Sequence, residues 1–234
     1  YFVNNFSPYM VGDDESGSKL PNMGVFTGYY YPMLNASRVK GGKYRFPIYK
    51  KPQPSLMSLS REDISNGALE GKKLEIFWVD DPVDLFFLHI QGSGLLKLRE
   101  GGYAHVKFSA KNNQPYASIG KYAVDMKYVK KGQDVRTFLH NNPQLANDVM
   151  NNNKSYIFFE ENKEGVVVGA HGSELVDGRS LAVDNKYIPY GLMMYVDAGD
   201  RRNVMFSQDT GSAIKGKIRG DIFVGKGFEA GEEA

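Results

Sequence analysis

The stretch that decides the fold is Ser207-Gln-Asp-Thr-Gly-Ser-Ala-Ile-Lys-Gly-Lys-Ile-Arg-Gly-Asp-Ile-Phe-Val-Gly-Lys-Gly227. Two carboxylates, Asp209 and Asp221, lie next to apolar runs that are typical of β-strands. Glycines are spread through these runs, and glycine lets the backbone approach another strand or a ligand closely. The segment is therefore predicted to fold back on itself and to hold an acid rigidly at the edge of a groove.

The composition is that of an ordinary globular protein. The chain has 234 residues, 41% of them hydrophobic, so one large or two small domains fit. Lys+Arg 29 against Asp+Glu 27 leaves a net charge of +2, which gives no sign of nucleic-acid binding. Cysteine is absent, which excludes disulfides and thiol catalysis. No apolar run reaches the roughly 18 residues of a membrane helix, and a start at Tyr1 leaves room for a removed leader or tether.

Short strands dominate the pattern along the chain, and they favour a barrel or sandwich over a parallel α/β sheet. A helix is expected to start at Ser60, which is followed three positions later by Asp63. Two or three further short helices are expected, at about 118–125, 134–141 and 143–150. The expected strands are 25–31, 44–49, 74–79, 83–90, 95–98, 104–110, 155–159, 166–168, 180–183, 192–196 and 203–206.

Several catalytic motifs find no support. Gln91-Gly-Ser-Gly94 has no Gly-Lys-Ser/Thr after it, so it is not a phosphate loop. A Gly-x-Ser-x-Gly nucleophile elbow is absent. The four histidines show no metal-ligand spacing and are interpreted as structural or surface residues: His89, His105, His140 and His171.

Asp209-Thr-Gly-Ser212 reproduces the signature of aspartic proteases. That chemistry needs two such loops, whose carboxylates share a proton and activate water. Asp221 is followed by Ile-Phe, so it does not supply the second motif.

Together with its neighbours, the tail resembles the C-terminal signature of the membrane-bound lytic murein transglycosylase A family. The matching blocks are Asp-Thr-Gly-Ser-Ala-Ile-Lys-Gly at 209–216 and Arg-Gly-Asp-Ile-Phe-Val-Gly-Lys-Gly at 219–227. Further blocks keep the order of the family and extend the resemblance over nearly the whole chain: 26–32, 86–94, 113–120, 155–159, 178–184 and 188–191.

This resemblance implies a mainly β fold, a double-psi β-barrel with an inserted second β-rich domain that carries a few short helices. The barrel domain would consist of 1–32 plus 164–234 and the insert of 33–163, with a groove for a glycan strand between them. Two departures from the family stand out. Tyr31 replaces a smaller hydroxyl residue and is expected to bring a bulkier ring to the groove rim. The chain also stops at 231–234, where relatives usually continue into another strand.

The activity that the resemblance implies is a lyase reaction, the cleavage of the MurNAc–GlcNAc β-1,4 bond of peptidoglycan without water. The C6 hydroxyl of MurNAc attacks its own C1 and leaves a 1,6-anhydro ring. Ordinary glycosidases need a second carboxylate, but here the substrate brings the nucleophile, so one acid is enough. Asp221 matches the catalytic aspartate of the family. Its pKa must lie above the usual value of about 3.9, and burial or the charge of Asp209 would raise it. Asp209 is interpreted as a catalytic support and Asp184 as structural.

Sugar recognition would fall to groups that bond hydroxyls and acetamides. The expected substrate-binding residues are Thr27, Tyr29, Gln91, Ser93, Ser212, Ala213, Lys215 and Arg219. Lys215 and Arg219 would pair with lactyl or peptide carboxylates; the alternative is that they are solvated loop charges. Gln91-Gly-Ser-Gly94 is equally compatible with a tight turn that binds nothing.

Two other functions stay open on the sequence, a non-catalytic glycan-binding barrel and an aspartic protease that uses Asp209. The expected partners are peptidoglycan glycan strands, without nucleic acid, cofactor or metal. Other cell-wall enzymes are possible partners that the sequence does not identify. The murein substrate and the family imply the periplasm, with a lipid anchor in the outer membrane that lies outside this chain.

Overall fold

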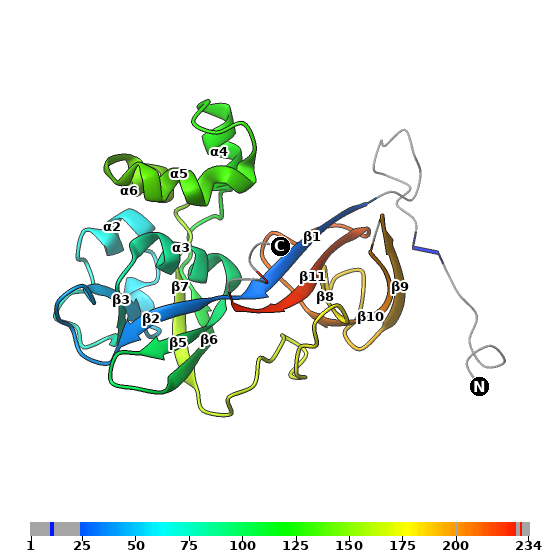
Figure 1. Ribbon diagram of the computed structural model, residues 1–234, viewed down its shortest axis with the longest axis horizontal. Helices are drawn as coiled ribbons and strands as arrows, with labels where there is room; N and C mark the ends of the chain where they lie inside the picture. The colour runs from blue at the N-terminus through cyan, green and yellow to red at the C-terminus, as the bar shows by residue number, and fades with distance from the viewer. Residues whose placement is uncertain (1–9, 12–23, 200, 228–229, 231–234) are drawn as a thin grey trace. The chain divides into compact units, whose positions relative to one another are not determined.

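The computed structural model describes residues 10–11, 24–199, 201–227 and 230, and its contacts divide the chain into two units (Figure 1). Unit 1 consists of Tyr1–Tyr30, Val167–Gly225 and Ala230–Ala234, and unit 2 of Tyr31–Val166 and Lys226–Glu229. The expected domain boundaries, 32–33 and 163–164, lie near the first two of these divisions. Residues 1–9, 12–23 and 231–234 of the expected barrel lie outside the described residues. The extent of that domain and the groove therefore stay predictions.

Unit 1 contains a five-stranded sheet with the order β1-β11-β8-β10-β9. The central strand β8 is buried along its whole length and runs parallel to β10 but antiparallel to β11. Strands β9 and β10 form an antiparallel hairpin. The strands are β1 (Val25–Tyr31), β8 (Ser180–Val183), β9 (Met193–Ala198), β10 (Arg201–Asp209) and β11 (Arg219–Lys226).

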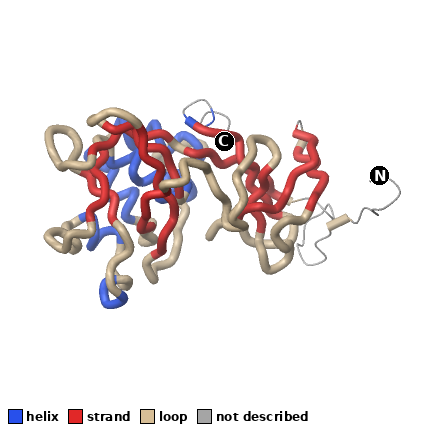
Figure 2. Tube along the Cα trace, turned by 90° about the horizontal axis from the view of Figure 1, so that it is seen from below, coloured by secondary structure: helices blue, strands red, loops and turns tan. Residues whose placement is uncertain are grey.

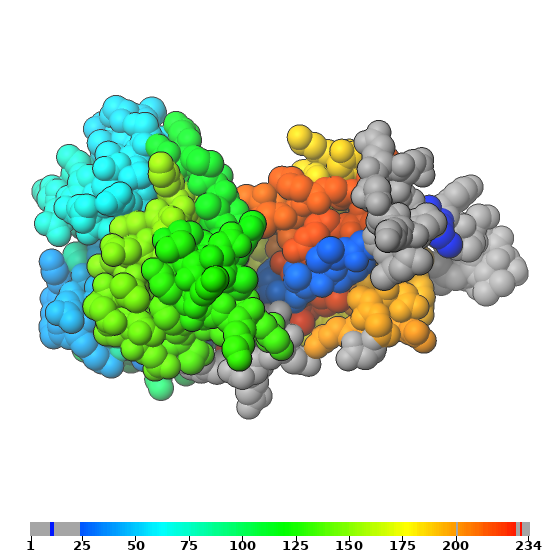
Figure 3. Space-filling view, turned by 90° about the horizontal axis from the view of Figure 1, so that it is seen from above, coloured from blue at the N-terminus to red at the C-terminus, as the bar shows by residue number. Residues whose placement is uncertain are grey.

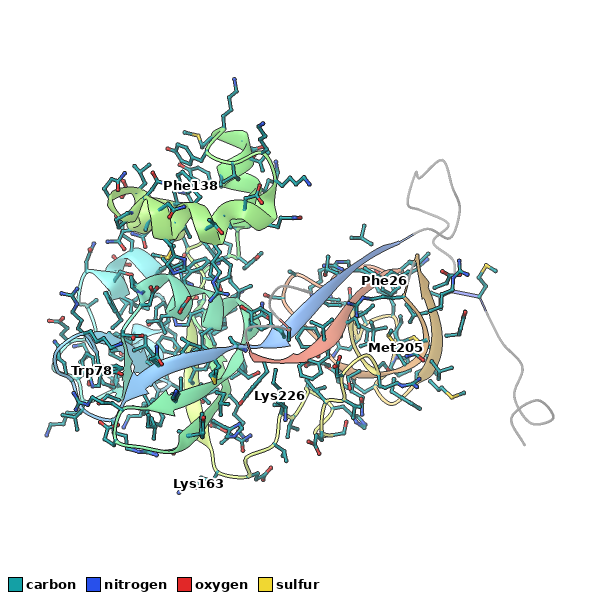
Figure 4. The ribbon with its side chains drawn as sticks, in the orientation of Figure 1. Phe26, Trp78, Phe138, Lys163, Met205 and Lys226 are labelled. Atoms are coloured by element: carbon teal, nitrogen blue, oxygen red, sulfur yellow. The ribbon has the colours of Figure 1, made fainter. Side chains whose placement is uncertain are left out.

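The core of unit 1 is built from alternate residues of these strands, as expected for a sheet with one covered face. Leu181 and Val183 of β8 pack with Ile222 and Val224 of β11 and with Met205 of β10. Figure 4 labels Met205 and also Phe26, which packs against this core from β1. These contacts fix the strands that carry both aspartates of the C-terminal stretch.

Unit 2 contains a six-stranded sheet with the order β3-β4-β2-β5-β6-β7. The strands are β2 (Met33–Ser37), β3 (Phe46–Tyr49), β4 (Glu75–Val79), β5 (Ser93–Leu98), β6 (Tyr103–Lys111) and β7 (Ile157–Asn162). The helices are α2 (Arg61–Ser65), α3 (Pro82–Gln91), α4 (Ile119–Asp125), α5 (Val135–Asn141) and α6 (Pro143–Asn151), with 3-10 turns η1 (Pro54–Leu56) and η2 (Gly132–Asp134).

Helix α3 joins the two layers of unit 2 because it buries both of its faces. Leu88 packs into the core of the sheet, whereas Phe86 packs with the helices α4 to α6. Figure 2 shows the helices of this unit beside its strands. Among the described residues, none of the helices has the length and apolar character needed to cross a bilayer.

The prediction of a strand at 83–90 is wrong, since this segment belongs to α3. Pro82 stands at the start of the helix, and the Asp81 side chain accepts from the N–H groups of Val83 and Asp84 at 2.7 and 3.0 Å. Gly92, with φ 79°, ends the helix in the left-handed conformation. Burial on two faces removes the polar stripe that would mark an amphipathic helix, so the apolar run resembles a buried strand.

The remaining elements confirm a mainly β fold with a few short helices. Ser60 and Asp63 form the expected capping box of α2. The expected strand at 166–168 is wrong, because only an isolated bridge between Val168 and Glu174 forms there. Strand β2 was not expected. In the described part of the chain the unit 1 sheet ends at β1 and β9, so the finer assignment as a closed double-psi barrel stays a proposal.

Candidate active site

The two aspartates of the C-terminal stretch flank one residue of β8. Asp221 pairs with Ala182 across β11 and β8, and Asp209 pairs with Ala182 across β10 and β8. Residues at one rung of a sheet direct their side chains to the same face, and neighbouring strands lie about 4.8 Å apart. The two Cα atoms are therefore roughly 10 Å apart. The register shifts between Ser207 and Asp209, an irregularity of the kind that re-aims side chains near functional sites.

Strand β1 supplies a hydroxyl to each aspartate. Thr27 and Tyr29 are two residues apart and thus share one face of the strand. Thr27 Oγ1 donates to Asp221 Oδ1 at 2.6 Å, and the Tyr29 hydroxyl donates to Asp209 Oδ2 at 2.9 Å. The Tyr29 ring also packs on Phe223, with 5.4 Å between centroids. The two aspartates are therefore positioned by one strand from the other end of the sequence.

Arg219 fixes the direction of the hydrogen bond to Asp221. Its Nη2 donates to Thr27 Oγ1 at 2.9 Å, and its Nη1 donates to the carbonyl oxygens of Val25 at 3.0 Å and Gly220 at 2.7 Å. A guanidinium group has no acceptor, so Thr27 accepts from Arg219 and gives its own proton to Asp221. Arg219 therefore acts on Asp221 through Thr27.

Asp209 has a full set of hydrogen-bond donors. The backbone N–H groups of Ala170 and Thr210 donate to its Oδ1, each at 2.9 Å, in addition to Tyr29 on Oδ2. Gly169 allows this approach, because a Cβ there would lie 2.3 Å from the Gln208 carbonyl oxygen. Nothing in the sequence pattern pointed to Ala170, since it contributes only a backbone N–H; the neighbouring glycine is the one signal.

Asp221 differs from Asp209 in having one oxygen available. Of its two carboxyl oxygens, only Oδ1 accepts a hydrogen bond from a residue that the structure describes. Gly220 precedes it in β11, and a Cβ at Gly220 would lie 2.6 Å from the Phe26 ring. Close packing of the backbone therefore positions the acid, as the glycines of the quoted stretch indicated.

Burial raises the pKa of both aspartates. For Asp209, the hydrogen bonds from Ala170, Thr210 and Tyr29 partly offset this rise in pKa. For Asp221, Thr27 and Arg219 partly offset it, and the charge of Asp209 adds to it. Each carboxyl group therefore holds a proton to a higher pH than an exposed aspartate does.

The surroundings of Asp184 shift its pKa in the opposite direction, below the usual value. Its Oδ2 accepts from the Gly216 N–H at 3.0 Å and its Oδ1 from the Lys186 N–H at 3.2 Å. These hydrogen bonds, led by the one from Gly216, lower the pKa of Asp184, and the charge of Lys215 lowers it further. Asp184 therefore fastens the loop between β10 and β11 as an anion, which supports its structural interpretation.

The other expected substrate-binding residues lie in two places. Ser212, Ala213 and Lys215 are exposed in the loop between β10 and β11 of unit 1. Gln91 ends α3 and Ser93 begins β5 in unit 2, where Gly92 makes the tight turn that the alternative interpretation expected. Contact of these residues with a sugar stays a prediction.

Tyr31 does not fit the expectation of a ring at an exposed rim. Its side chain is only 1% exposed, and its hydroxyl is 3.0 Å from His105 Nδ1. Both residues belong to unit 2. The larger side chain is accommodated by burial and a hydrogen bond.

One cluster in the described residues has donor atoms close enough for a metal ion, within 4.8 Å of one another: Asp81, Asp84 and His140. Arg136 Nη2 already donates to Asp84 Oδ1 at 2.7 Å, and Asp81 caps α3. A guanidinium in the cluster disfavours a second cation. We therefore interpret these side chains as an ion-pair network at the start of α3.

Two half-buried aspartates in a β-rich unit, each hydrogen-bonded to a hydroxyl group of β1, define an acid–base site. A second β-rich unit lies in the middle of the chain. The chain matches a family model described as the MltA specific insert domain at 25–59 and 53–160, and a model described as the 3D domain at 179–234. It belongs to the membrane-bound lytic murein transglycosylase A (MltA) family.

Individual relatives agree with this assignment. The chain is 32% identical over 227 residues to the membrane-bound lytic murein transglycosylase A of Escherichia coli K12, which covers 89% of this chain and 61% of that protein. The crystal structure of E. coli MltA with bound chitohexaose has a TM-score of 0.83 and 31% identity, covering 89% of this chain and 67% of that one. The crystal structure of the membrane-bound lytic murein transglycosylase from Agrobacterium tumefaciens has a TM-score of 0.82 and 32% identity. This match covers 88% of this chain and 69% of that one. The chain thus spans less than two thirds of the E. coli protein.

Proposed function

We propose that this chain is a peptidoglycan lytic transglycosylase that cleaves the MurNAc–GlcNAc β-1,4 bond and forms 1,6-anhydro-MurNAc. The observation that carries the proposal is the contrast between the two carboxyl groups. Burial raises the pKa of both, but Asp209 accepts hydrogen bonds at both oxygens, whereas Oδ2 of Asp221 has no donor in the part of the chain that the structure describes. An acid that must give up a proton needs such an oxygen.

In the proposed reaction Asp221 serves first as acid and then as base. Its Oδ2 proton moves to the glycosidic oxygen O4 of GlcNAc as the bond from C1 of MurNAc to O4 breaks. O6 of MurNAc then bonds to C1 and loses its proton to Asp221, which returns to its starting state. Water takes no part, and one carboxyl group serves both steps, unlike the pair of carboxylates in ordinary glycosidases.

The neighbouring residues take supporting roles in this proposal. Asp209 raises the pKa of Asp221 through its charge, which keeps the acid protonated nearer neutral pH. Thr27, held by Arg219, orients the Oδ1 side of Asp221, and Tyr29 orients Asp209. Sugar contacts from Gln91, Ser93, Ser212, Ala213 and Lys215 are part of the proposal and are not needed for the proton transfer.

The relatives support the substrate and the location. They are named membrane-bound lytic murein transglycosylases, and one structure of the E. coli protein holds chitohexaose. We accordingly propose glycan strands of peptidoglycan as substrate and the periplasmic side of the outer membrane as location. The matches to the insert and 3D models support assigning unit 2 as the insert and unit 1 as a double-psi barrel.

Mass spectrometry of digested sacculi in water enriched in heavy oxygen tests the proposal. The expected fragments end in 1,6-anhydro-MurNAc and carry no solvent oxygen. Reducing ends that contain heavy oxygen would mean hydrolysis. Binding of sacculi without any release of fragments would instead favour a non-catalytic glycan-binding barrel.

A further inference from the structure

Unit 2 contains a cavity of about 320 Å³ that plays no part in the proposed cleavage. Its lining includes exposed residues of α2 and α6, among them Ser65 and Asn147, and buried residues that include Arg61 and His89. Figure 3 shows the segments of α2 and α6 at the surface of this unit. The cavity is therefore a recess that leads from the surface to buried polar groups. Its volume is at the lower end of the range for small-molecule sites, about 300–1,000 Å³.

The buried guanidinium of Arg61 has more donors than acceptors around it. The residue is 4% exposed. Its Nε donates to the Asn153 carbonyl oxygen at 2.9 Å, Nη2 to the Ser155 carbonyl oxygen at 2.6 Å and Nη1 to His89 Nδ1 at 2.9 Å. A guanidinium has five N–H donors, so two have no acceptor among the described residues. Within that same part of the chain, no carboxylate forms a salt bridge with it, and burial lowers the pKa of Arg61 to about 10.

His89 adds a second donor without an acceptor. Because Arg61 can only donate, His89 Nδ1 must accept, and the ring proton is then on Nε2. His89 is 5% exposed, and its Nε2 has no hydrogen-bond partner among the residues that the structure describes. Burial and the charge of Arg61 lower the pKa of His89, so the ring is neutral at pH 7.

Aromatic rings hold Arg61 in place beside the cavity. Its guanidinium carbon lies 4.5 Å from the Phe86 ring centroid and 5.2 Å from that of Tyr156, and both rings line the cavity. These contacts place the guanidinium over the faces of the two rings and leave its remaining N–H groups for further hydrogen bonds. A ligand with a planar pair of acceptor oxygens and a small apolar body matches this arrangement.

We propose that this cavity binds a small carboxylic acid of the size of an amino acid or dipeptide. Its carboxylate accepts from the remaining N–H groups of Arg61 and from His89 Nε2–H, and its body packs on the rings of Phe86 and Tyr156. Two cationic side chains, Arg61 and the exposed Arg45, line the cavity together with the exposed carboxylate of Glu70. One positive charge is therefore left uncompensated, which favours a monoanion over a phosphate dianion. The proposal does not depend on the proposed cleavage, because Asp209 and Asp221 belong to unit 1.

A matched pair of ligands tests this on the wild-type protein without any substitution. The full chain, labelled with ¹⁵N, is titrated with N-acetylalanine and with N-acetylalaninamide while the four histidine ring signals are followed. We expect the carboxylate to bind at least about tenfold more tightly than the amide and to move the His89 Nε2–H signal. Acetate and inorganic phosphate are the comparison anions, and weaker binding of acetate shows that the body of the ligand contributes. Equal affinity for the acid and the amide, tighter binding of phosphate, or an unmoved His89 signal would overturn the proposal.

Two variants of one helix locate the binding. Asn147 lines the cavity and is exposed on α6, so Asn147→Trp should cover the opening and weaken binding of N-acetylalanine about tenfold. Gln144 is exposed on the same helix but does not line the cavity, so Gln144→Trp should leave the affinity unchanged. Circular dichroism checks that both variants fold. If Asn147→Trp binds as the wild type does, the carboxylate binds elsewhere and the assignment is wrong. Because the readout is binding in the absence of murein, its failure does not bear on the cleavage reaction.

Discussion

The two aspartates of unit 1, Asp209 and Asp221, and the Arg61–His89 pair of unit 2 differ in how completely their hydrogen bonds are satisfied. Asp209 receives three hydrogen bonds from its own chain, so its oxygens are satisfied by the fold. Arg61 and His89 share one hydrogen bond and leave N–H groups without acceptors among the residues that the structure describes. Asp221 resembles the second pair more than it resembles Asp209, since one of its oxygens has no donor in the described chain.

This difference distinguishes polar groups that stabilise the fold from polar groups that are positioned to exchange a proton or bind a ligand. A buried polar group without a partner is costly, and native proteins keep few of them. Where one persists next to satisfied neighbours, it marks the place where a proton or a ligand is expected. Substitutions at groups of both kinds test whether a polar group with all its partners and one that lacks a partner have different roles.

Asp221→Asn should have the largest effect, on activity. An asparagine cannot give a proton to the leaving oxygen, and acid–base catalysis contributes about 10²–10⁴-fold. We expect the release of 1,6-anhydro fragments from sacculi to fall by about 10³-fold, measured by mass spectrometry. Stability should change little or rise, since a buried acid is removed at a site shaped for function.

Asp184→Asn is the matched control for this loss, because Asp184 is an aspartate of the same unit whose side chain, among the described residues, accepts hydrogen bonds from backbone N–H groups alone. It should lower stability but retain most of the activity of the folded protein. Full activity of Asp221→Asn would contradict the assignment of the acid.

Arg61→Met should have the largest effect on stability. It leaves the carbonyl oxygens of Asn153 and Ser155 and the Nδ1 of His89 without their donor. Each unpaired buried group costs about 1–3 kcal/mol, so we expect the free energy of unfolding to fall by about 3 kcal/mol, measured by urea denaturation. Arg45→Met, at an exposed residue of the same cavity, should change it by less than about 0.5 kcal/mol. Equal effects would show that burial of Arg61 contributes nothing.

The fold was predictable where local signals and packing agree. The capping box at Ser60 and Asp63 and the strand at 25–31 follow local rules, and both were confirmed. Helix α3 was predicted as a strand because packing on two faces removes the polar stripe from its sequence. Strand β2 contains Asn35 and Ser37 among small and apolar residues and lacks the strict alternation of apolar and polar residues that identifies a half-buried strand.

The parts of the site that are formed by side chains were predictable from the sequence, and the parts that depend on the backbone or on packing were not. Asp209, Asp221, Thr27 and Tyr29 were chosen from the sequence, and the structure brings these four together in unit 1. The N–H group of Ala170 was not predictable, because any residue supplies one. The donors of Arg61 and His89 that lack an acceptor in the described part of the chain could not be predicted either, since a missing partner is a property of the packed structure.

Thr27→Val tests the positioning of Asp221 and should have a moderate effect. The variant loses the hydroxyl that donates to Asp221 and accepts from Arg219. That hydrogen bond lowers the pKa of Asp221, so its loss should raise this pKa and shift the alkaline limb of the pH–activity profile to higher pH. The rate at the optimum should fall about tenfold through loss of orientation, while Thr27→Ser should restore both. A variant that loses rate without any shift of the alkaline limb would place Thr27 in substrate contact instead.

The pH dependence of stability should show the smallest effect. The pKa values of Asp209 and Asp221 are raised in the folded protein, so the folded state binds more protons than the unfolded state near and above the unfolded pKa of about 3.9. Their contribution to stability is complete below that pH and is lost as the pH rises through the folded pKa values. Asp184 has a lowered pKa, so its contribution is present above the unfolded pKa and is lost as the pH falls through its folded pKa. Urea denaturation between about pH 4 and pH 8 should therefore show a decline in the free energy of unfolding that disappears in the double variant Asp209→Asn/Asp221→Asn. A decline that persists in the double variant would assign the pH dependence to other groups and remove the support that burial gives to Asp221 as the acid.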